Sequence, residues 1–354
     1  MKDDCLLPAL CAVALLAAGC GTYPRSGVSQ PRGAEIERQL RQRAATLPTA
    51  LEEKILALDP MHVTDRDIRE VLGSVPAPRI ILIHGGISTV ISHMVSFSDF
   101  LAGMGYPALS ITNPGDGTYT FSCYESAGVI AGSIAWYYEK EGLRPMMIGH
   151  SQGGFQVVKV LKKLAPHPSR KVEVWNPVTW QSEKRYEITD PLNGKTQPVV
   201  GLKLPYVSGV GGGGLTRVLP NQWDMLGSLR TIPDSVEEFT CFYKHNDLLG
   251  GDLLGYGSLN HSQASGTAVV RNVRLPSSYA HGKIPDTRHL LATPELRDWI
   301  NDFSPDRPLS GEPKFDADSH NILWAADVWY SIKKHWVLEL QRSIRARRAQ
   351  PHAR

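Results

Sequence analysis

Apolar residues in the first half of the chain form short unbroken runs that alternate with runs at helical spacing. Residues 79–84 (RIILIH) are a β-branched run without polar alternation, typical of a strand buried on both faces of a parallel sheet. The pattern then predicts helix, strand, helix, strand and helix over residues 93–105, 106–114, 123–142, 145–149 and 152–165. Because short Gly/Pro junctions separate these runs, the sequence predicts a three-layer α/β fold with crossover helices covering a mostly parallel sheet.

The pattern becomes less regular after Pro168. Residues 171–177 (KVEVWNP) predict a further core strand, and residues 184–207 predict a β-hairpin that turns at residues 190–194. A Gly-rich stretch follows that the sheet does not need, so we interpret about residues 178–235 as an inserted cap. Two more core strands and a closing helix are expected at residues 237–247, 267–276 and 293–303.

Helical patterns flank this main domain, which we assign to residues 76–300. Residues 34–75 predict an N-terminal helical segment that is broken near Pro48. Residues 301–354 predict a C-terminal helical extension after a Pro-rich linker. The tryptophans of this extension favour either packing on the main domain or contact with a partner or a bilayer; they are Trp324, Trp329 and Trp336.

Composition excludes few classes of protein. The chain has 354 residues, of which 42% are hydrophobic and 21% charged, and this is ordinary for a globular α/β domain. A formal net charge of +3 gives no reason to expect a nucleic-acid partner. The arginines near the C-terminus are interpreted as a solvated helix end, where cations suit the helix dipole.

The N-terminus has the pattern of an export signal. Residues 6–20 (LLPALCAVALLAAGC) form an apolar segment that is too short to span a bilayer comfortably and ends in small residues before a cysteine. LAAGC resembles the lipobox of bacterial lipoproteins, which implies a signal peptide at 1–19, a lipidated Cys20 and a tether at 20–33. The n-region MKDD and Ala17 depart from the usual pattern, so a plain secretory signal or an anchor helix remains the alternative.

Two cysteines remain beyond the signal and the lipobox. Cys123 and Cys241 could pair in an oxidising compartment, although Cys241 lies in a strand pattern and a buried thiol is the alternative. Neither has a CxxC or Cys/His spacing, so the sequence predicts no metal site and no cofactor. The predicted location is the bacterial outer membrane or its periplasmic face, and Gly21 after the cysteine favours the outer membrane.

The strongest chemical motif lies between a predicted strand and a predicted helix. Residues 149–153 read Gly-His-Ser-Gln-Gly, which matches G-x-S-x-G in the strand–turn–helix context that the motif requires. Such a sharp turn projects the hydroxyl of Ser151 from the end of the sheet. A serine hydroxyl needs a base to take its proton and dipoles to receive an oxyanion before it is an effective nucleophile.

With the LIHGG run at residues 82–86, the chain resembles the α/β-hydrolase superfamily, in particular its lipase and esterase branch, over roughly residues 76–300. The resemblance implies an oxyanion hole formed by the backbone amides of Gly86 and Gln152. It also implies the chain order serine, acid, histidine. His84 and His150 are expected to stiffen the loop and to pack beside the serine.

The acid and the base each have two candidates. Asp247 follows the strand after the cap, at the sheet edge where site loops gather, and Asp252 is its rival in the same loop. Both histidines lie between the last predicted strand and the closing helix. His281 is the nearer to the strand, and His289 comes just before the helix. We favour His289, because a base needs a rigid neighbour to place it.

These residues predict a serine esterase or lipase that acts on ester or acyl substrates through an acyl-enzyme and is tethered to a membrane by its N-terminal lipid. An acyltransferase or thioesterase would use the same residues. A lipoprotein that keeps the fold for binding or assembly, without turnover, is the alternative from another class.

Overall fold

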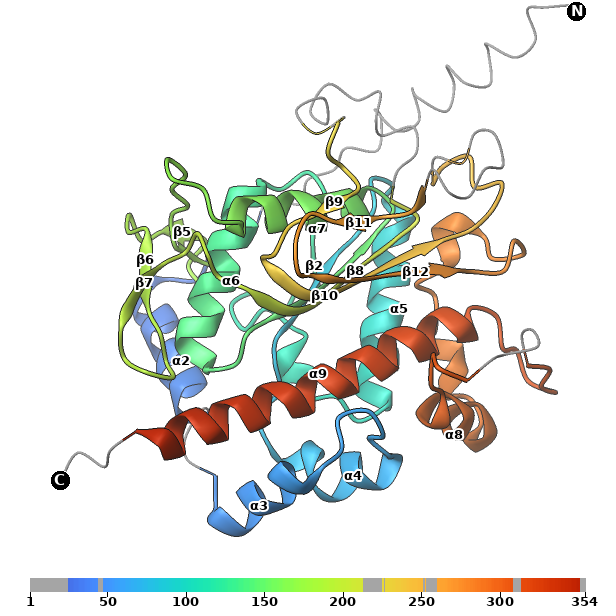
Figure 1. The fold of residues 1–354 in the computed structure, drawn as a ribbon, viewed down its shortest axis with the longest axis horizontal. Coiled ribbons are helices and arrows are strands. Elements are labelled where there is room, and N and C mark those ends of the chain that lie inside the picture. Colours follow the sequence, from blue (N-terminus) through green and yellow to red (C-terminus); the bar gives the residue numbers. More distant parts are fainter. Residues whose placement is uncertain are drawn as a thin grey trace, which may run out of the picture.

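The computed structural model describes residues 25–43, 47–212, 225, 227–250, 252, 260–307 and 313–350. At its centre lies a parallel sheet of six strands in the order β12-β10-β8-β3-β1-β2 (Figure 1). The predicted α/β class with a mostly parallel sheet is confirmed. The strands are β1 (Ile80–Ile83), β2 (Thr120–Phe121), β3 (Met146–His150), β8 (Leu204–Val210), β10 (Val236–Tyr243) and β12 (Val269–Arg274).

The direction in which strands are added reverses between β1 and β3. From β1 the chain adds β2 on one side, then returns to add β3, β8, β10 and β12 on the other. In open α/β sheets, ligands bind outside the carboxyl ends of the strands at such a reversal. The loop after β1 and the turn after β3 therefore meet at the position where the topology favours a site.

Helices cover both faces of the sheet. Side chains along β1 alternate between two buried clusters, so that Leu82 packs in the cluster with Phe97 and Ile83 in the cluster with Val157. The first cluster is covered by α5 (Thr89–Gly103), α8 (Pro294–Asp302) and α9 (Ile322–Ala349), and the second by α2 (Gln30–Arg43), α6 (Ala127–Glu141) and α7 (Gln152–Leu164).

The N-terminal helical segment is confirmed as α2, α3 (Thr49–Ala57) and α4 (Asp65–Glu70), with the predicted break at Pro48. Thr64 forms a capping box with Asp67, which supplies partners for two amides at the start of α4. The predicted tether at 20–33 is wrong for its described part. The amide of Val28 donates to the carbonyl oxygen of Val178 at 3.0 Å, and α2 already begins at Gln30.

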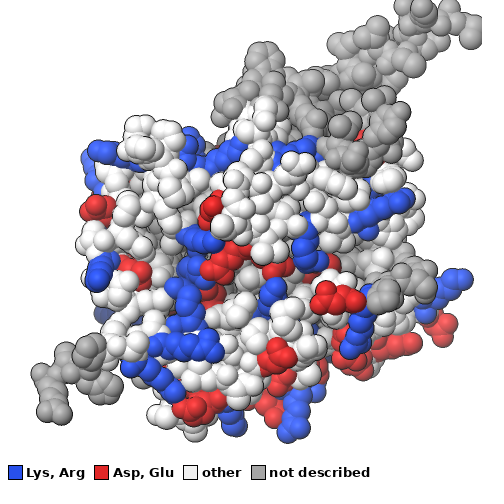
Figure 2. All heavy atoms as spheres, in the orientation of Figure 1, with Lys and Arg blue, Asp and Glu red and all other residues white. Residues whose placement is uncertain are grey.

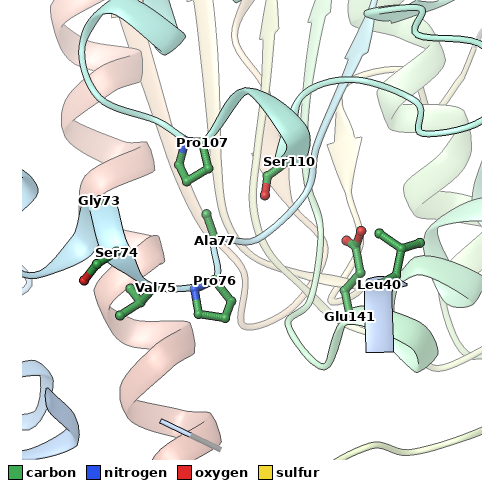
Figure 3. Close-up of a pocket in the computed structure, with 9 residues that line it drawn as sticks. All are labelled: Leu40, Gly73, Ser74, Val75, Pro76, Ala77, Pro107, Ser110 and Glu141. Carbon is green, nitrogen blue, oxygen red and sulfur yellow. The ribbon is translucent and has the colours of Figure 1, made fainter. Parts of the chain in front are cut away.

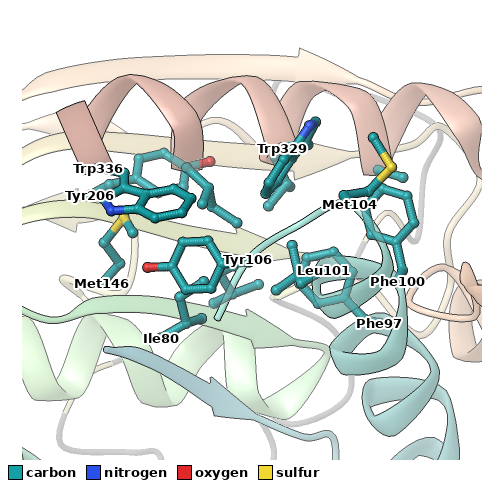
Figure 4. Close-up of a cluster of buried hydrophobic side chains, with 14 of the residues drawn as sticks. Ile80, Phe97, Phe100, Leu101, Met104, Tyr106, Met146, Tyr206, Trp329 and Trp336 are labelled. Atoms are coloured by element: carbon teal, nitrogen blue, oxygen red, sulfur yellow. The ribbon is translucent and has the colours of Figure 1, made fainter. Parts of the chain in front are cut away.

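Helix α9 belongs to the core. Trp324, Trp329 and Trp336 are fully buried, which excludes them as a surface for a partner or a bilayer and confirms the packing alternative. Trp336 stacks edge-on against Tyr106 with ring centroids 4.8 Å apart (Figure 4), and its indole N–H donates to the carbonyl of Pro76. The hydrogen bond satisfies the polar end of a buried indole.

Residues 171–177 do not form a strand of the central sheet. They contribute only β4 (Trp175–Asn176), which pairs antiparallel with β5 (Gln181–Ser182). The hairpin predicted to turn at residues 190–194 is confirmed as β6 (Glu187–Thr189) and β7 (Thr196–Pro198). Outside the main sheet, β9 (Thr231–Ile232) also pairs with β11 (Gln263–Ala264).

The assignment of the whole of 178–235 to a cap is wrong, because β8 is a central strand between β3 and β10. Every residue of β8 is buried. Pro205, Ser208 and Gly209 interrupt its apolar run, and this is why the pattern hid it. Both faces of β8 are covered, so burial depends on its place in the sheet rather than on its local hydrophobicity.

The strand predicted at 106–114 is also wrong. Pro107 precedes a 3₁₀ turn, η2 (Ala108–Ser110), and the Asn113 side chain accepts the amide of Gly115 in a following turn. The strand beside β1 is the short β2, in which Phe121 is paired with Ile83. A second 3₁₀ turn, η1 (Leu72–Ser74), follows α4.

A buried ion pair joins α9 to the start of β3. The Arg144 guanidinium donates to the Glu339 carboxylate, with Nε 3.0 Å from Oε1, and the Glu339 side chain is 1% exposed. Arg144→Met leaves that carboxylate buried without its main partner, so we expect the free energy of unfolding to fall by about 3–5 kcal/mol in urea titrations. Arg66→Met, in an exposed pair with Glu70, is the control and should change it by less than about 1 kcal/mol. Equal losses of unfolding free energy in the two variants would contradict a stabilising role for the buried Arg144–Glu339 pair.

Charged side chains of both signs are interspersed on the face that α9 crosses (Figure 2). This face therefore offers no uniform basic surface of the kind that binds a phosphate backbone. Among the described residues, no helix combines the length and the apolar character needed to cross a bilayer.

Candidate active site

Ser151 lies in a strained turn between β3 and α7. Its backbone has φ 56° and ψ −120°, a conformation that costs a residue other than glycine free energy and persists only where the surroundings impose it. The Ser151 amide donates to the carbonyl of Val210 at 2.8 Å. Gly153 permits the turn, because a Cβ at that position would lie 2.2 Å from the carbonyl oxygen of Ile83. The predicted strand–turn–helix context is confirmed.

A histidine and a carboxylate form a hydrogen-bonded chain with this serine. His281 Nε2 lies 2.8 Å from Ser151 Oγ, and His281 Nδ1 lies 2.8 Å from Asp247 Oδ2. The carboxylate lies in the loop after β10, four residues beyond Tyr243, and its other oxygen accepts the amide of Gly250 at 3.0 Å. Because Asp247 accepts the Nδ1 proton, the lone pair of Nε2 faces the serine hydroxyl, as proton removal from that hydroxyl requires.

The choice of His289 as the base is wrong in position. His289 lies in the 3₁₀ turn η7 (Arg288–Leu291), and its Nε2 is 3.0 Å from the carbonyl oxygen of His320. It thus points toward the start of α9 rather than toward Ser151. The histidine that reaches the serine is the alternative, His281, at the start of η6 (His281–Lys283).

The loop of His281 is held by side chains from two elements distant in sequence, the end of β3 and helix α5. His150 Nε2 lies 2.7 Å from the carbonyl oxygen of His281, and His93 Nδ1 lies 2.7 Å from that of Gly282. Gly211, at φ 61°, makes room for the ring, since a Cβ there would be 2.8 Å from His281 Cε1. Sequence reasoning missed His93 and Gly211. Gly211 directly follows β8, so recognising that strand would have indicated Gly211 as a residue at the carboxyl edge of the sheet.

Asp247 and Asp252 have different roles in one loop. Asp252 Oδ2 accepts the amide of Asn246, and its own amide donates to the carbonyl of Asp247. Asp252 therefore closes the loop, while Asp247 contacts the histidine, which agrees with the choice of Asp247. Burial opposes the charge on Asp247, but the hydrogen bond and charge of His281 outweigh it, so its pKa lies below the ordinary value.

Burial and the neighbouring charge of His281 lower the pKa of His150 from 6.5 to about 3. His150 is therefore neutral near pH 7 and can donate from Nε2 to the His281 carbonyl. The expectation that it packs beside the serine is confirmed.

The pKa of His150 predicts a pH-dependent stability. Between pH 6.5 and about 3 the unfolded chain binds a proton that the folded chain excludes, so the free energy of unfolding decreases as the pH falls through this range. Between pH 7 and pH 5, the free energy of unfolding of His150→Gln should fall by about 2 kcal/mol less than that of the wild type, as measured by urea unfolding at both pH values. His167→Gln, at an exposed position, should retain the wild-type dependence. If His150→Gln also retains the wild-type pH dependence, the loss of stability at low pH does not come from His150.

The loop after β1 brings its glycines to the serine. A Cβ on Gly85 would lie 3.0 Å from Ser151 Cβ, and one on Gly86 would lie 2.4 Å from Gln152 Oε1 and 2.7 Å from the Tyr124 hydroxyl. The two predicted oxyanion residues are thus in contact. The polar atoms of the Gln152 side chain are buried and have no hydrogen-bond partner among the described residues. Sequence reasoning missed Tyr124, which no local motif distinguishes.

Two cavities differ in their relation to this site. One of about 390 Å³ is lined by Tyr124, Gln156 and Met225 and lies beside the serine turn, since Tyr124 also contacts Gly86. Another of about 280 Å³ lies at the amino ends of the strands, beside Ala77 and Pro107 (Figure 3), and is remote from the serine. Trp223 and Leu226, two apolar residues of the segment predicted to form a cap, lie outside the described residues.

No disulfide joins Cys123 to Cys241. Within the described ranges, no three His, Cys, Asp or Glu side chains are grouped so that they could hold a metal ion. The predicted signal peptide and Cys20 lie outside the described part of the chain. No model of a known protein family and no curated protein matches this sequence.

Proposed function

We propose that the protein is a serine hydrolase that cleaves carboxylic esters on an α/β-hydrolase fold. The observation that carries this proposal is the continuous chain of hydrogen bonds from Asp247 through His281 to Ser151, with both links at 2.8 Å. The strained backbone at Ser151 supports it, since strain of this kind concentrates at functional sites. The position of the site, at the reversal point of a parallel sheet, supports it further.

In the proposed mechanism, Ser151 Oγ attacks the ester carbonyl while His281 Nε2 takes the hydroxyl proton. The carbonyl π electrons move to oxygen, and the tetrahedral oxyanion collapses with expulsion of the alkoxide, which His281 protonates. Water, deprotonated by His281, then attacks the acyl-enzyme and releases the acid. Asp247 stabilises the imidazolium that forms in each half of the reaction and fixes its tautomer.

The proposed oxyanion hole consists of the backbone amides of Gly86 and Gln152. Gln152 opens α7, where unpaired amides and the helix dipole favour negative charge. Contact between Gly86 and the Gln152 side chain supports this assignment. One such donor contributes roughly 3–4 kcal/mol to transition-state stabilisation.

Export and tethering through a lipidated Cys20 are part of the proposal and depend on the LAAGC motif. An acyltransferase or a thioesterase would use the same groups with another acceptor or leaving group. A binding lipoprotein without turnover is a weaker alternative, because binding alone does not need a histidine poised between a carboxylate and a strained serine.

A fluorophosphonate probe and a chain-length series of p-nitrophenyl esters test the proposal. We expect stoichiometric labelling at Ser151, located by mass spectrometry, and p-nitrophenol release that depends on acyl length. Hydrolysis of short chains only would indicate an esterase, and preference for long chains a lipase. A folded protein that neither reacts with the probe nor releases p-nitrophenol would overturn the proposal in favour of the binding alternative.

A further inference from the structure

The first described residues of the chain are clamped against the edge strand β2. The guanidinium carbon of Arg25 lies 4.0 Å from the centroid of the Phe121 ring and 5.0 Å from that of Trp180. The guanidinium also donates to the carbonyl of Thr120. Stacking on two aromatic rings and a charge-assisted hydrogen bond fix the position of Arg25, the residue to which the preceding chain is attached.

This Arg25 clamp lies at the same edge of the sheet as the candidate triad. Phe121 is paired with Ile83, and Ile83 with Gly149, two residues before Ser151. Two strand spacings therefore separate the clamp from the serine turn, or about 10 Å. Arg25 also lies close to the loop after β1, since burial lowers the pKa of His84 in that loop and the charge of Arg25 lowers it further.

The predicted lipid attachment is close to this clamp in sequence. Cys20 precedes Arg25 by five positions, and five extended residues span at most about 18 Å. A bilayer that holds the acyl chains of Cys20 therefore lies near Arg25, on the side of the domain where the sheet edge carries Ser151. A longer or unclamped connection would leave the orientation of the domain unrestricted.

Large apolar side chains are exposed on the site loops at this edge. Ile87 directly follows Gly86, and Leu248 and Leu249 directly follow Asp247. Leu248 is 56% exposed, although it stands next to a buried carboxylate. Exposed apolar side chains next to a functional site are typical of surfaces that contact a partner or a membrane.

We infer that the carboxyl edge of the sheet docks on the lipid bilayer through a rim formed by Ile87, Leu248 and Leu249, so that the substrate is an acyl ester presented at the membrane surface. The substrate class rests on the proposed function, and the orientation rests on the Arg25 clamp and the tether. Apolar groups of interfacial proteins enter the boundary between headgroups and acyl chains by about 5–10 Å. The lipid holds the protein at the membrane, and the rim and clamp set which edge faces it.

Fluorescence quenching tests the orientation independently of catalysis. The lipidated full-length protein, with Leu248→Cys or Leu109→Cys in a Cys241→Ser background, is labelled with bimane and bound to phosphatidylethanolamine/phosphatidylglycerol vesicles that contain brominated acyl chains. Leu109 is the matched control, because it is 59% exposed and lies at the amino edge, beside the start of β1. We expect strong quenching at position 248 and little at position 109.

Equal quenching at the two positions, or stronger quenching at position 109, would overturn the docking. So would mass spectrometry that finds no lipid on Cys20 in protein isolated from bacterial membranes. Quenching at position 248 in a protein that hydrolyses no ester would support the docking and refute the proposed function, so the two failures are distinguishable.

An activity measurement tests the substrate class. The double variant Leu248→Ser/Leu249→Ser should lower the ratio of kcat/KM for a vesicle-borne long-chain ester to that for soluble p-nitrophenyl butyrate by about tenfold. Leu109→Ser should leave this ratio unchanged. An unchanged ratio in the double variant would show that the rim does not bring the enzyme to its substrate.

Discussion

Replacing Ser151 by alanine is expected to lower kcat/KM for p-nitrophenyl esters by at least about 10⁴-fold and to abolish fluorophosphonate labelling. Alanine lacks the hydroxyl that forms the acyl bond, while the buried surroundings of the turn are unchanged. The substitution removes the hydrogen bond between His281 and Ser151 and leaves the one between His281 and Asp247 in place. Steady-state kinetics and intact-protein mass spectrometry measure the two effects.

The residual rate in Ser151→Ala would come from the oxyanion amides and from substrate binding alone. Ser169→Ala, at an exposed loop position, is a suitable control and should retain full activity and labelling. Far-ultraviolet circular dichroism and urea unfolding check that both variants are folded. A Ser151→Ala protein that keeps more than about one-tenth of the wild-type rate would show that the serine is not the nucleophile.

The serine turn could be predicted from the sequence because its determinants are local. Two glycines around Ser151, an apolar strand before it and an amphipathic helix after it lie within about twenty residues and define one supersecondary unit. Asp247 could be predicted for a related reason. It lies in the loop after a strand with clear β propensity, and the carboxyl ends of parallel strands gather at one edge.

Strand β8 could not be predicted because its burial depends on its neighbours. Its composition, with Pro205 and Gly209, resembles that of the loops around it, but β3 and β10 cover its two edges and helices cover its faces. Hydrophobic periodicity reports local pattern, and a central strand can be specified by its context instead. Helix α9 shows the opposite case, because a clear pattern predicted the helix but could not tell whether its tryptophans faced the domain or a partner.

The wrong choice between His281 and His289 has the same origin. The need of a base for rigid support favours a histidine next to a helix, as His289 is. His281 has such support too, but from contacts distant in sequence. His150 and His93 bind the carbonyls of the His281 loop across 131 and 189 positions of the chain. A single sequence contains no local signal for such contacts.

The second large effect follows from this geometry: His281→Ala is expected to lower kcat/KM by about 10⁴- to 10⁶-fold at pH 7, whereas His289→Ala changes it by less than about threefold. His281 lies between the serine and the carboxylate, so its loss removes the proton acceptor and leaves Asp247 without its partner. His289 instead contacts the carbonyl of His320 and the carboxylate of Asp318 near the surface. Both variants are measured with the same p-nitrophenyl ester.

The comparison of the two histidines also separates base catalysis from simple support of the loop. His281→Gln retains a polar side chain of similar length, so a structural role would be largely rescued and catalysis would not. His150→Gln, which alters the support of the loop but not the base, should cost far less than His281→Ala. If His289→Ala were the inactive variant and His281→Ala the active one, the hydrogen-bonded chain in the structure would not be the catalytic one, and the proposed mechanism would have to be abandoned.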